Sequence, residues 1–251
     1  MGSAFIGKAK VYIAPYASGS AFEARTFRYV ENCSNFQFGF AEEEKKLLDY
    51  ASASGGVDAS VKRITDVTGS LDLRHLTADN LAMVLWGTTT TSSSVAAITG
   101  EAGYTVSPGG FAPTKKPIDT TVAPVVKKGA TVISTADYTV TAGGILFAST
   151  ISTAGITPGD AITIDYTPQA SASIQSLIST APDVSIMVEG VNEVDGSYVV
   201  WRGYKCKLGV ASGISLIGDD FATLTVSFAV QKDETIVTAG KSKYFEMQAA
   251  A

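Results

Sequence analysis

Apolar residues recur at every second position in several stretches of this 251-residue chain, which is the pattern of a strand with one buried face. The clearest stretch is 221–231, whose alternating apolar positions are Leu224, Val226, Phe228 and Val230. Other strands are expected in stretches of similar pattern: 5–14, 25–31, 67–73, 184–190 and 204–210. Alternation on one side only is typical of antiparallel sheets, so the pattern predicts a mainly β fold.

Three phenylalanines spaced two apart, Phe36, Phe38 and Phe40, predict one further strand with an apolar face. The acidic segment Glu42–Glu44 follows after one residue. We expect the strand to end where these charges begin.

One helix is predicted over residues 78–86. Thr77 suits the N-cap position, and Asp79 in the first turn is favoured by the positive end of the helix dipole. Gly87 sits where a helix commonly stops. An apolar stripe at helical spacing lies between these signals: Leu81, Val84 and Leu85. This stripe is expected to pack on the sheet.

A change of composition after Gly87 marks an insertion. Residues 88–180 contain 30 Ser and Thr, six of the eight prolines and none of the five arginines. Short apolar stretches with glycine turns recur inside them, which favours a small β-domain over one long irregular loop. We therefore predict a discontinuous β-domain, 1–90 plus 181–251, and an inserted Ser/Thr/Pro-rich β-domain, 91–180, for which an immunoglobulin-like fold is one option.

Composition and charge restrict the classes of partner. Charged residues make up 17% of the chain, and the formal net charge is −5. A protein that holds nucleic acid is expected to be basic, so specific binding of DNA or RNA is not expected. The only cysteines, Cys33 and Cys206, do not suffice for a disulfide framework or a four-cysteine zinc site. The N-terminus lacks a signal-peptide pattern and no stretch is long enough to span a membrane, so a soluble chain made in the cytosol is expected.

A search for catalytic and cofactor motifs finds none, so no enzyme, no cofactor and no metal are expected. The single histidine, His75, lies between a strand and a helix cap, where a structural role is the simplest reading. The segment AGKS at 239–242 lacks the first glycine of a phosphate-binding loop. Asp219–Asp220 and Glu42–Glu44 lack the alternating ligand spacing of a calcium loop and indicate turns and surface charge.

Two parts of the chain carry a family resemblance. Residues 32–87 contain the acidic segment EEEKKLLDY, a Ser/Gly stretch, the strand pattern DVTGSLDL and the helix pattern TADNLAMVLWG. Residues 183–234 contain EGVNEVDG and then DDFATLTV, the opening of a long final strand in the family. In this order the segments resemble siphophage tail tube proteins. The insert departs from the minimal family pattern, although DYTVTAGGILF and GDAITIDY resemble small β-modules that some members carry.

The resemblance implies an antiparallel β-sandwich or barrel that forms hexameric rings, and rings that stack into a tube. In the family, the loop between the second and third strands takes part in contacts between successive rings. That loop corresponds to residues 41–62 here. The candidate ring-stacking residues are therefore Glu42, Glu43, Glu44, Lys45, Lys46 and Asp49.

The resemblance also implies the partners and the location. The expected partners are further copies of the chain, a tape measure protein, a tail terminator and tail-tip proteins, with no membrane. Phage DNA would pass through the tube into the host cell without specific binding. The location would be the virion, after assembly in the host cytoplasm. Outside residues 91–180, 19 acids stand against 15 bases, so the wall of such a tube would repel phosphate.

Three alternative functions remain. The chain could form the inner tube of a contractile tail or of a secretion system, although such tubes are usually more compact. A surface adhesive or carbohydrate-binding β-module is a second alternative, against which the absent secretion signal counts. An enzyme is the third and has almost no support in the sequence.

Overall fold

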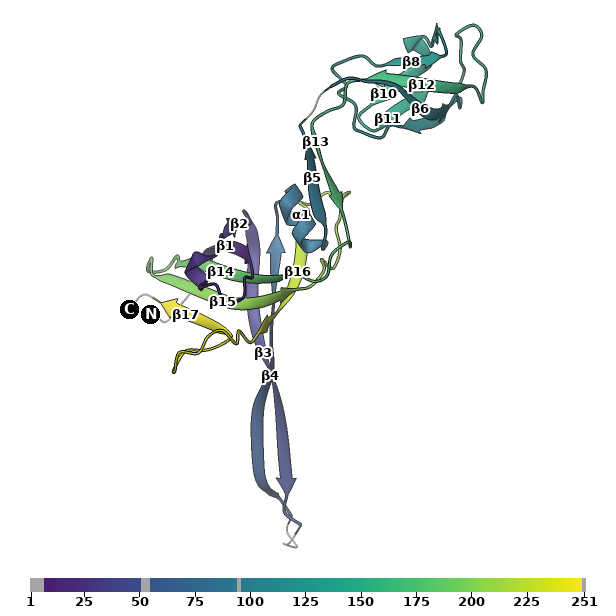
Figure 1. The fold of residues 1–251 in the computed structure, drawn as a ribbon. Coiled ribbons are helices and arrows are strands. Elements are labelled where there is room, and N and C mark those ends of the chain that lie inside the picture. The colour runs from purple at the N-terminus through teal and green to yellow at the C-terminus, as the bar shows by residue number, and fades with distance from the viewer. Residues whose placement is uncertain (1–6, 51–54, 94–95, 250–251) are drawn as a thin grey trace. The chain divides into compact units, whose positions relative to one another are not determined.

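The computed structural model describes residues 7–50, 55–93 and 96–249. It confirms a mainly β fold with antiparallel sheets, and the described residues contain one α-helix. The chain divides into two compact units (Figure 1). Unit 1 comprises Met1–Thr89 and Ile174–Ala251, and unit 2 comprises Thr90–Ser173. The predicted insert, 91–180, extends beyond unit 2 at its C-terminal end, because residues 174–180 belong to unit 1.

Unit 1 is built on one large sheet of strand order β2-β1-β14-β15-β16-β4-β3, with β17 also paired to β15. Its strands are β1 Gly7–Pro15, β2 Arg28–Tyr29, β3 Cys33–Leu48, β4 Val57–Leu73, β14 Asp183–Asn192, β15 Tyr198–Leu208, β16 Leu224–Gln231 and β17 Phe245–Ala249. The strand expected at 25–31 is reduced to the two residues of β2. A short 3₁₀ helix, Phe22–Ala24, occupies the chain just before it.

The period-two pattern correctly identified the core of unit 1. Leu224, Val226, Phe228 and Val230 are all at most 4% exposed, and Leu71 and Leu73 of β4 are fully buried. Strand β15 contributes Trp201, Cys206 and Leu208 to the same cluster. The one-sided alternation therefore reports a sheet that packs one face inward, as an antiparallel sheet does.

The sheet of unit 1 curves around this core. Residues Val199–Gly203 of β15 pair with β17, whereas Lys205–Leu208 pair with β16. Strand β3 is separated from β15 by two strands in the sheet order, yet Phe36 lies 5.1 Å from Trp201 between ring centroids. Contact between strands that are not neighbours requires the sheet to fold over on itself, as in a barrel.

Helix α1, Ala78–Val84, is shorter than the predicted 78–86. The hydroxyl of Thr77 accepts a hydrogen bond from the Asn80 N–H, as an N-cap does. At the other end Gly87 N–H donates to the Ala82 carbonyl at 2.8 Å, while Trp86 takes the left-handed conformation, with φ of 50°. The left-handed residue that ends the helix is therefore Trp86, one residue before the expected Gly87. Gly87 is required for a different reason, since a Cβ there would lie 2.2 Å from the Gln175 carbonyl oxygen.

Of the predicted loop 41–62, residues 51–54 lie outside the described residues, and residues 42–48 and 57–62 are strand instead of loop. Strand β3 therefore does not end at the acidic segment. Strand β3 continues through Glu42–Lys46 to Leu48 and pairs with β4 from Val57 onward, so the two strands form one long hairpin (Figure 1). The register shifts after Ala41, which faces Asp66, because Glu42 faces Ile64 and leaves Thr65 without an opposite residue. Such a bulge increases the local twist of a ribbon.

The strand that begins after Asp219–Asp220 is also not the final one. Strand β16 starts at Leu224, and β17 follows it after the segment 232–244. That final strand covers the half of β15 that β16 leaves free, and its Phe245 packs 5.9 Å from Trp201 between ring centroids. Strand β17 therefore completes the aromatic part of the core.

Unit 2 consists of two small antiparallel sheets around its own core. One sheet has the order β10-β11-β7 and the other β6-β12-β8-β9. Their bounds are β6 Ile98–Thr105, β7 Phe111–Pro113, β8 Val125–Lys128, β9 Thr131–Val132, β10 Tyr138–Thr141, β11 Gly144–Phe147 and β12 Ala161–Tyr166, with a 3₁₀ helix at Thr135–Asp137. Ile145 of β11 and Ile164 of β12 are fully buried in the shared core. Strands β5, Thr88–Ser92, and β13, Ser171–Gln175, pair with each other where the chain passes between the units.

Candidate assembly surface

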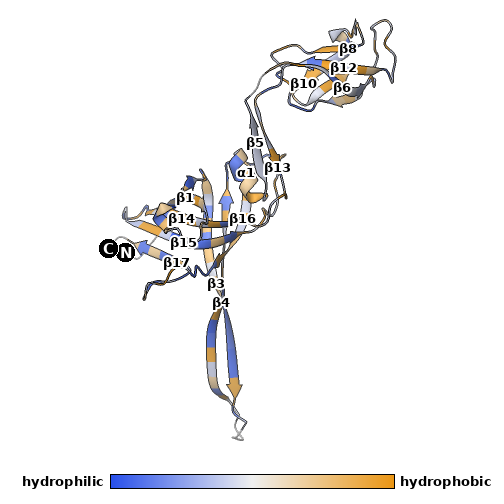
Figure 2. Cartoon of the chain, viewed as in Figure 1, coloured by the Kyte–Doolittle hydropathy of each residue, from blue (hydrophilic) through white to orange (hydrophobic). Residues whose placement is uncertain are grey.

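The outer part of the β3–β4 hairpin is exposed in the described part of the chain. We call its described residues, 42–50 and 55–64, the arm. Every residue from Ala41 to Leu48 and from Gly55 to Asp66 is exposed, on both faces of the ribbon. Figure 2 shows apolar and polar residues interspersed along the same two strands. The arm is therefore a two-stranded ribbon whose faces are both free to contact another molecule.

All six candidate stacking residues lie on or beside the arm. Glu42, Glu44 and Lys46 alternate with Glu43 and Lys45 along β3, so the two groups point to opposite faces of the ribbon. Asp49 follows the end of β3, and its N–H donates to the Gly56 carbonyl at 2.9 Å. The structure thus places five of the six candidates on a paired strand instead of an irregular loop, which gives those five a fixed direction.

The charges of the arm are arranged as opposite signs across and along the ribbon. Glu43 lies opposite Arg63 in the register, and Glu44 lies opposite Lys62. Along β3, the Lys45 ammonium is 3.8 Å from the Glu43 carboxylate and the Lys46 ammonium is 3.4 Å from that of Glu44. Exposed pairs of this kind contribute about 0–1 kcal/mol each, so they do not account for a free-standing ribbon.

Large apolar side chains on the arm were not singled out by the sequence reasoning. Tyr50 is 86% exposed and Ile64 is 62% exposed. Four more apolar residues of the arm are about half exposed: Leu47, Leu48, Val57 and Val61. A two-stranded ribbon is marginally stable in water by itself, and exposed apolar groups of this size gain free energy when another surface covers them.

Aromatic packing fixes the base of the hairpin. Phe38 stacks on Trp201 with ring centroids 5.5 Å apart, and Phe36 stacks on Phe228 at 5.5 Å. Gly69 of β4 lies beside this stack, where a Cβ would come within 2.4 Å of the Phe228 ring. The arm is therefore an extension of two strands that are anchored in the core.

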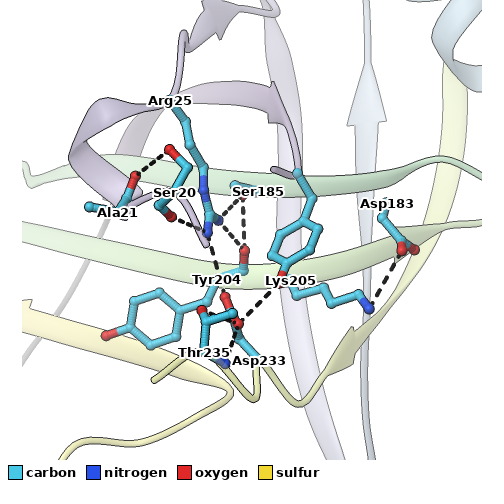
Figure 3. A network of polar contacts seen from close by, with 10 residues as sticks. Ser20, Ala21, Arg25, Asp183, Ser185, Tyr204, Lys205, Asp233 and Thr235 are labelled. Atoms are coloured by element: carbon cyan, nitrogen blue, oxygen red, sulfur yellow. Dashed lines mark hydrogen bonds and ion pairs between the residues drawn. The ribbon is translucent and has the colours of Figure 1, made fainter. Parts of the chain in front are cut away.

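A buried ion pair fixes the segment before β17. The Arg25 guanidinium lies 3.5 Å from the Asp233 carboxylate, with side chains 3% and 1% exposed (Figure 3). Arg25 also donates to the carbonyl of Tyr204 at 2.7 Å. Burial opposes ionisation of Asp233, but hydrogen bonds from Thr235, Tyr16 and Arg25 hold its pKa below the ordinary value. We interpret the network as a structural tie, because the terminal nitrogens of Arg25 and the carboxylate of Asp233 bind other parts of unit 1.

Of the remaining sequence candidates, His75 lies two residues after Leu73, which faces Cys33 in the register. His75 pairs with Glu31 on the surface. Burial raises the pKa of the Cys33 thiol and raises that of Cys206 to about 12, whereas a reactive thiol needs a lowered pKa. Residues 239–240 form a turn, and the described residues after them, 241–249, contain no helix. Within residues 7–50, 55–93 and 96–249, no three potential metal ligands cluster and no helix is long and apolar enough to cross a membrane.

Comparison with known families gives one match that spans nearly the whole chain. Residues 4–248 match the model of a family described as protein of unknown function UCP028589. The chain therefore belongs to that family. No curated protein matches the chain.

Proposed function

We propose that this protein is a structural subunit that assembles with copies of itself, and that the assembly is the tail tube of a siphophage. In this proposal hexameric rings stack into a tube that conducts DNA. The observation that carries the proposal is the arm: a long, anchored ribbon with opposite charges and large apolar side chains exposed on it. In a monomer the apolar side chains of the arm stay in water, whereas contact with another copy would bury them.

The edges of the unit 1 sheet support assembly. Strand β3 ends the strand order on one side, and the two-residue strand β2 ends it on the other. An edge strand of 16 residues presents a row of backbone groups that another chain can pair with. Rings arise when such a contact joins two different surfaces and the rotation closes.

The charge balance is compatible with a channel for DNA. Outside residues 91–180 the chain has 19 acids and 15 bases, a balance of −4. A tube repeats this excess in every subunit, and a confined wall of one sign strengthens the repulsion of phosphate. DNA would then pass without being held.

Concentration-dependent assembly tests the proposal directly. The dilute protein is expected to be monomeric or weakly associated, and rings or tubes are expected at high concentration or with tail-tip seeds. Light scattering and negative-stain microscopy across a concentration series measure this. A strict monomer at every concentration, with seeds present, contradicts the proposal.

The acidic residues of the arm give a more specific test. Changing Glu42, Glu43 and Glu44 together to Lys should shorten or abolish tubes while the melting temperature changes little, because the three residues are exposed. The matching Gln variant removes the charges without reversing them and should give an intermediate length. High salt should weaken the wild-type tube, since exposed charges are screened within about 10 Å at 0.1 M. Tubes of normal length from the Lys variant at low salt would exclude a role for these charges.

A further inference from the structure

The arm has two long edges, and no other strand of the described chain pairs with either of them (Figure 1). Strand β3 is the last strand of the sheet order, so its outer edge is open. Strand β4 pairs with β16 only over residues 68–73, which leaves its edge at 57–64 open as well. The arm therefore presents a row of backbone N–H and C=O groups on each side that another strand can use.

These edges are suited to pairing. The described residues of the arm include no proline, so each N–H along the edges can donate a hydrogen bond. Side chains of a strand point to the two faces of a ribbon, so the charged residues of the arm do not block its edges. Because a ribbon of two strands is marginally stable in water, the arm would gain stability from a further strand on either side.

The arm of a second copy supplies a strand that runs in the required direction. Within one copy β3 and β4 are antiparallel. When two arms lie side by side and point the same way, β3 of one copy therefore meets β4 of the next in antiparallel orientation. Each copy uses one edge for each neighbour. Contacts of this kind join two different surfaces, and they form a ring when the rotation closes.

The charges of the arm match this arrangement, although its five acids nearly balance its four bases. In the register of one copy, Glu43 faces Arg63 and Glu44 faces Lys62. If β3 of one copy meets β4 of the next in this register, the same pairs of opposite charge form between copies. A shift of two residues in one direction would bring Lys46 opposite Lys62. Like charges directly opposite each other destabilise a sheet, so the charges disfavour that shift.

The same charges disfavour a two-fold contact between two β3 strands. In an antiparallel pair related by a two-fold axis, the residue at the axis faces its own copy. All five residues of 42–46 are charged, so an axis anywhere within them sets a charge opposite an identical charge. Pairing of β3 with β4 avoids this repulsion. The occupant that fits each edge of the arm is therefore the other edge of a second arm.

We propose that the arms of neighbouring copies pair edge to edge, β3 of one copy with β4 of the next. This inference rests on the proposed function and adds to it the contact that the arm makes. A closed ring of arms forms one continuous antiparallel sheet around the ring axis and leaves no edge open.

Disulfide cross-linking of mixed copies tests the contact. One preparation carries Leu47→Cys in β3 and another carries Ala59→Cys in β4, at two positions that face each other in the register of the arm. Both also carry Cys33→Ser, which removes the partly buried native thiol. Mild oxidation of the assembled mixture should give a dimer of one copy of each. Either preparation alone should give little dimer, because it lacks the facing cysteine.

Val61→Cys in place of Ala59→Cys is the matched control for the register. Val61 faces Lys45 within a copy, so it lies opposite Leu47 of a neighbour only after the shift that brings Lys46 and Lys62 together. This pair should give at least about threefold less mixed dimer, since like charges disfavour the shift. All three cysteine positions are exposed and uncharged, so the variants should fold as the wild type does.

Hydrogen exchange of the backbone amides gives a second readout. In a two-stranded antiparallel ribbon, every second N–H of each strand is bonded to the partner strand and the others point outward. The outward amides of residues 42–48 and 57–64 should exchange rapidly in the dilute protein. Assembly should slow them by roughly tenfold or more, because the edge of the neighbouring arm accepts their hydrogen bonds.

The outcomes separate the two proposals. Tubes without the mixed dimer, or with unchanged exchange along the arm, would overturn the edge contact and leave the tube proposal standing. As much dimer from Leu47→Cys alone as from the mixture would indicate a two-fold contact and would also overturn it. The mixed dimer in rings that never stack would support the edge contact and contradict the tube. Absence of any wild-type assembly would overturn both.

Discussion

The two units differ in how far their large apolar side chains are exposed. In unit 2 the most exposed large apolar residue of the described chain is Val132, at 53%. In unit 1 several exceed 80%: Tyr50, Leu216, Ile217, Phe221 and Val237. The two units have cores of the same kind, so the difference lies in what each leaves uncovered.

Polar groups in unit 2 are correspondingly well satisfied. The Asp137 carboxylate accepts hydrogen bonds from the backbone N–H groups and the hydroxyls of Ser152 and Thr153, which lower its pKa to about 2. Glu101 accepts from Tyr104 and, at 2.9 Å, from Tyr166. Although burial opposes its ionisation, these bonds hold the pKa of Glu101 below the ordinary value. Unit 2 thus covers most of its large apolar side chains and pairs its buried carboxylates, whereas unit 1 leaves several large apolar side chains exposed.

The largest expected effect is that a substitution in the core of one unit destabilises that unit and not the other. Phe228→Ala removes a ring that is 2% exposed and should destabilise unit 1 by about 3–5 kcal/mol, through lost burial and a cavity. Ile164→Ala is the matched change in unit 2 and should cost about 2–5 kcal/mol there. Differential scanning calorimetry should show two transitions, of which each variant lowers one. If both transitions fall together in either variant, the units do not unfold independently.

The buried ion pair of unit 1 gives the next largest effect. Asp233→Asn leaves the Arg25 guanidinium buried without its anion and should cost about 3 kcal/mol in the free energy of unfolding of unit 1. The neighbouring Glu234→Gln is the control, because Glu234 is 66% exposed and solvent screens its ion pairs with Lys232 and Lys243, so this change should have a much smaller effect. Urea unfolding measures both. Equal effects would mean that burial of the pair is unimportant.

Acid should distinguish the units at Asp137. Its pKa is lowered from 3.8 to about 2 by hydrogen bonds from Thr153 and Ser152, so folding favours the ionised carboxylate. The resulting stability is present above pH 4 and is lost as the pH falls through about 2. Asp137→Asn should therefore lower the melting temperature of unit 2 at pH 7 and make it less sensitive to acid, with no change in unit 1. An unchanged acid profile of unit 2 would refute this role.

Removal of unit 2 should have the smallest effect. Replacing residues 90–173 by a short Gly/Ser linker keeps the hydrogen bonds from Leu177 N–H to the Leu85 carbonyl and from Ser179 N–H to the Trp86 carbonyl. Since closure of a flexible connection costs little more as its length changes, unit 1 should lose about 1 kcal/mol or less. Circular dichroism melts and the assembly assay measure this. Loss of a cooperative melt would show that unit 2 belongs to the core of unit 1.

The sequence was sufficient where a local pattern decides the structure. Leu224, Val226, Phe228 and Val230 alternate because one face of β16 is buried, and the same rule located the buried residues of β4 and β15. The helix was found from Thr77 and its apolar stripe for the same reason. These signals lie within one element, so neighbouring residues carry the information.

The sequence was insufficient where distant residues decide. Glu42–Lys46 have the composition of a surface loop, and their strand conformation depends on a partner strand that begins at Val57. Gly87 is needed because Gln175 passes beside it, and no local pattern reports that approach. Arg25 carries no signal either, since its partner Asp233 lies at the other end of the chain. The sequence identified the charged residues of the candidate surface. It did not predict their strand conformation or the exposed apolar side chains beside them.

The close approach of Gly87 to the Gln175 carbonyl has a practical consequence for protein engineering. The chain leaves unit 1 and returns to it at adjacent points, where the backbone bonds from Leu177 and Ser179 join the two passages. A graft at this position therefore has to meet one requirement only, which is that its own two ends lie close together. Enzymes, epitopes or fluorescent proteins with adjacent termini meet it. If the subunit assembles as proposed, each copy would display such a cargo at regular spacing.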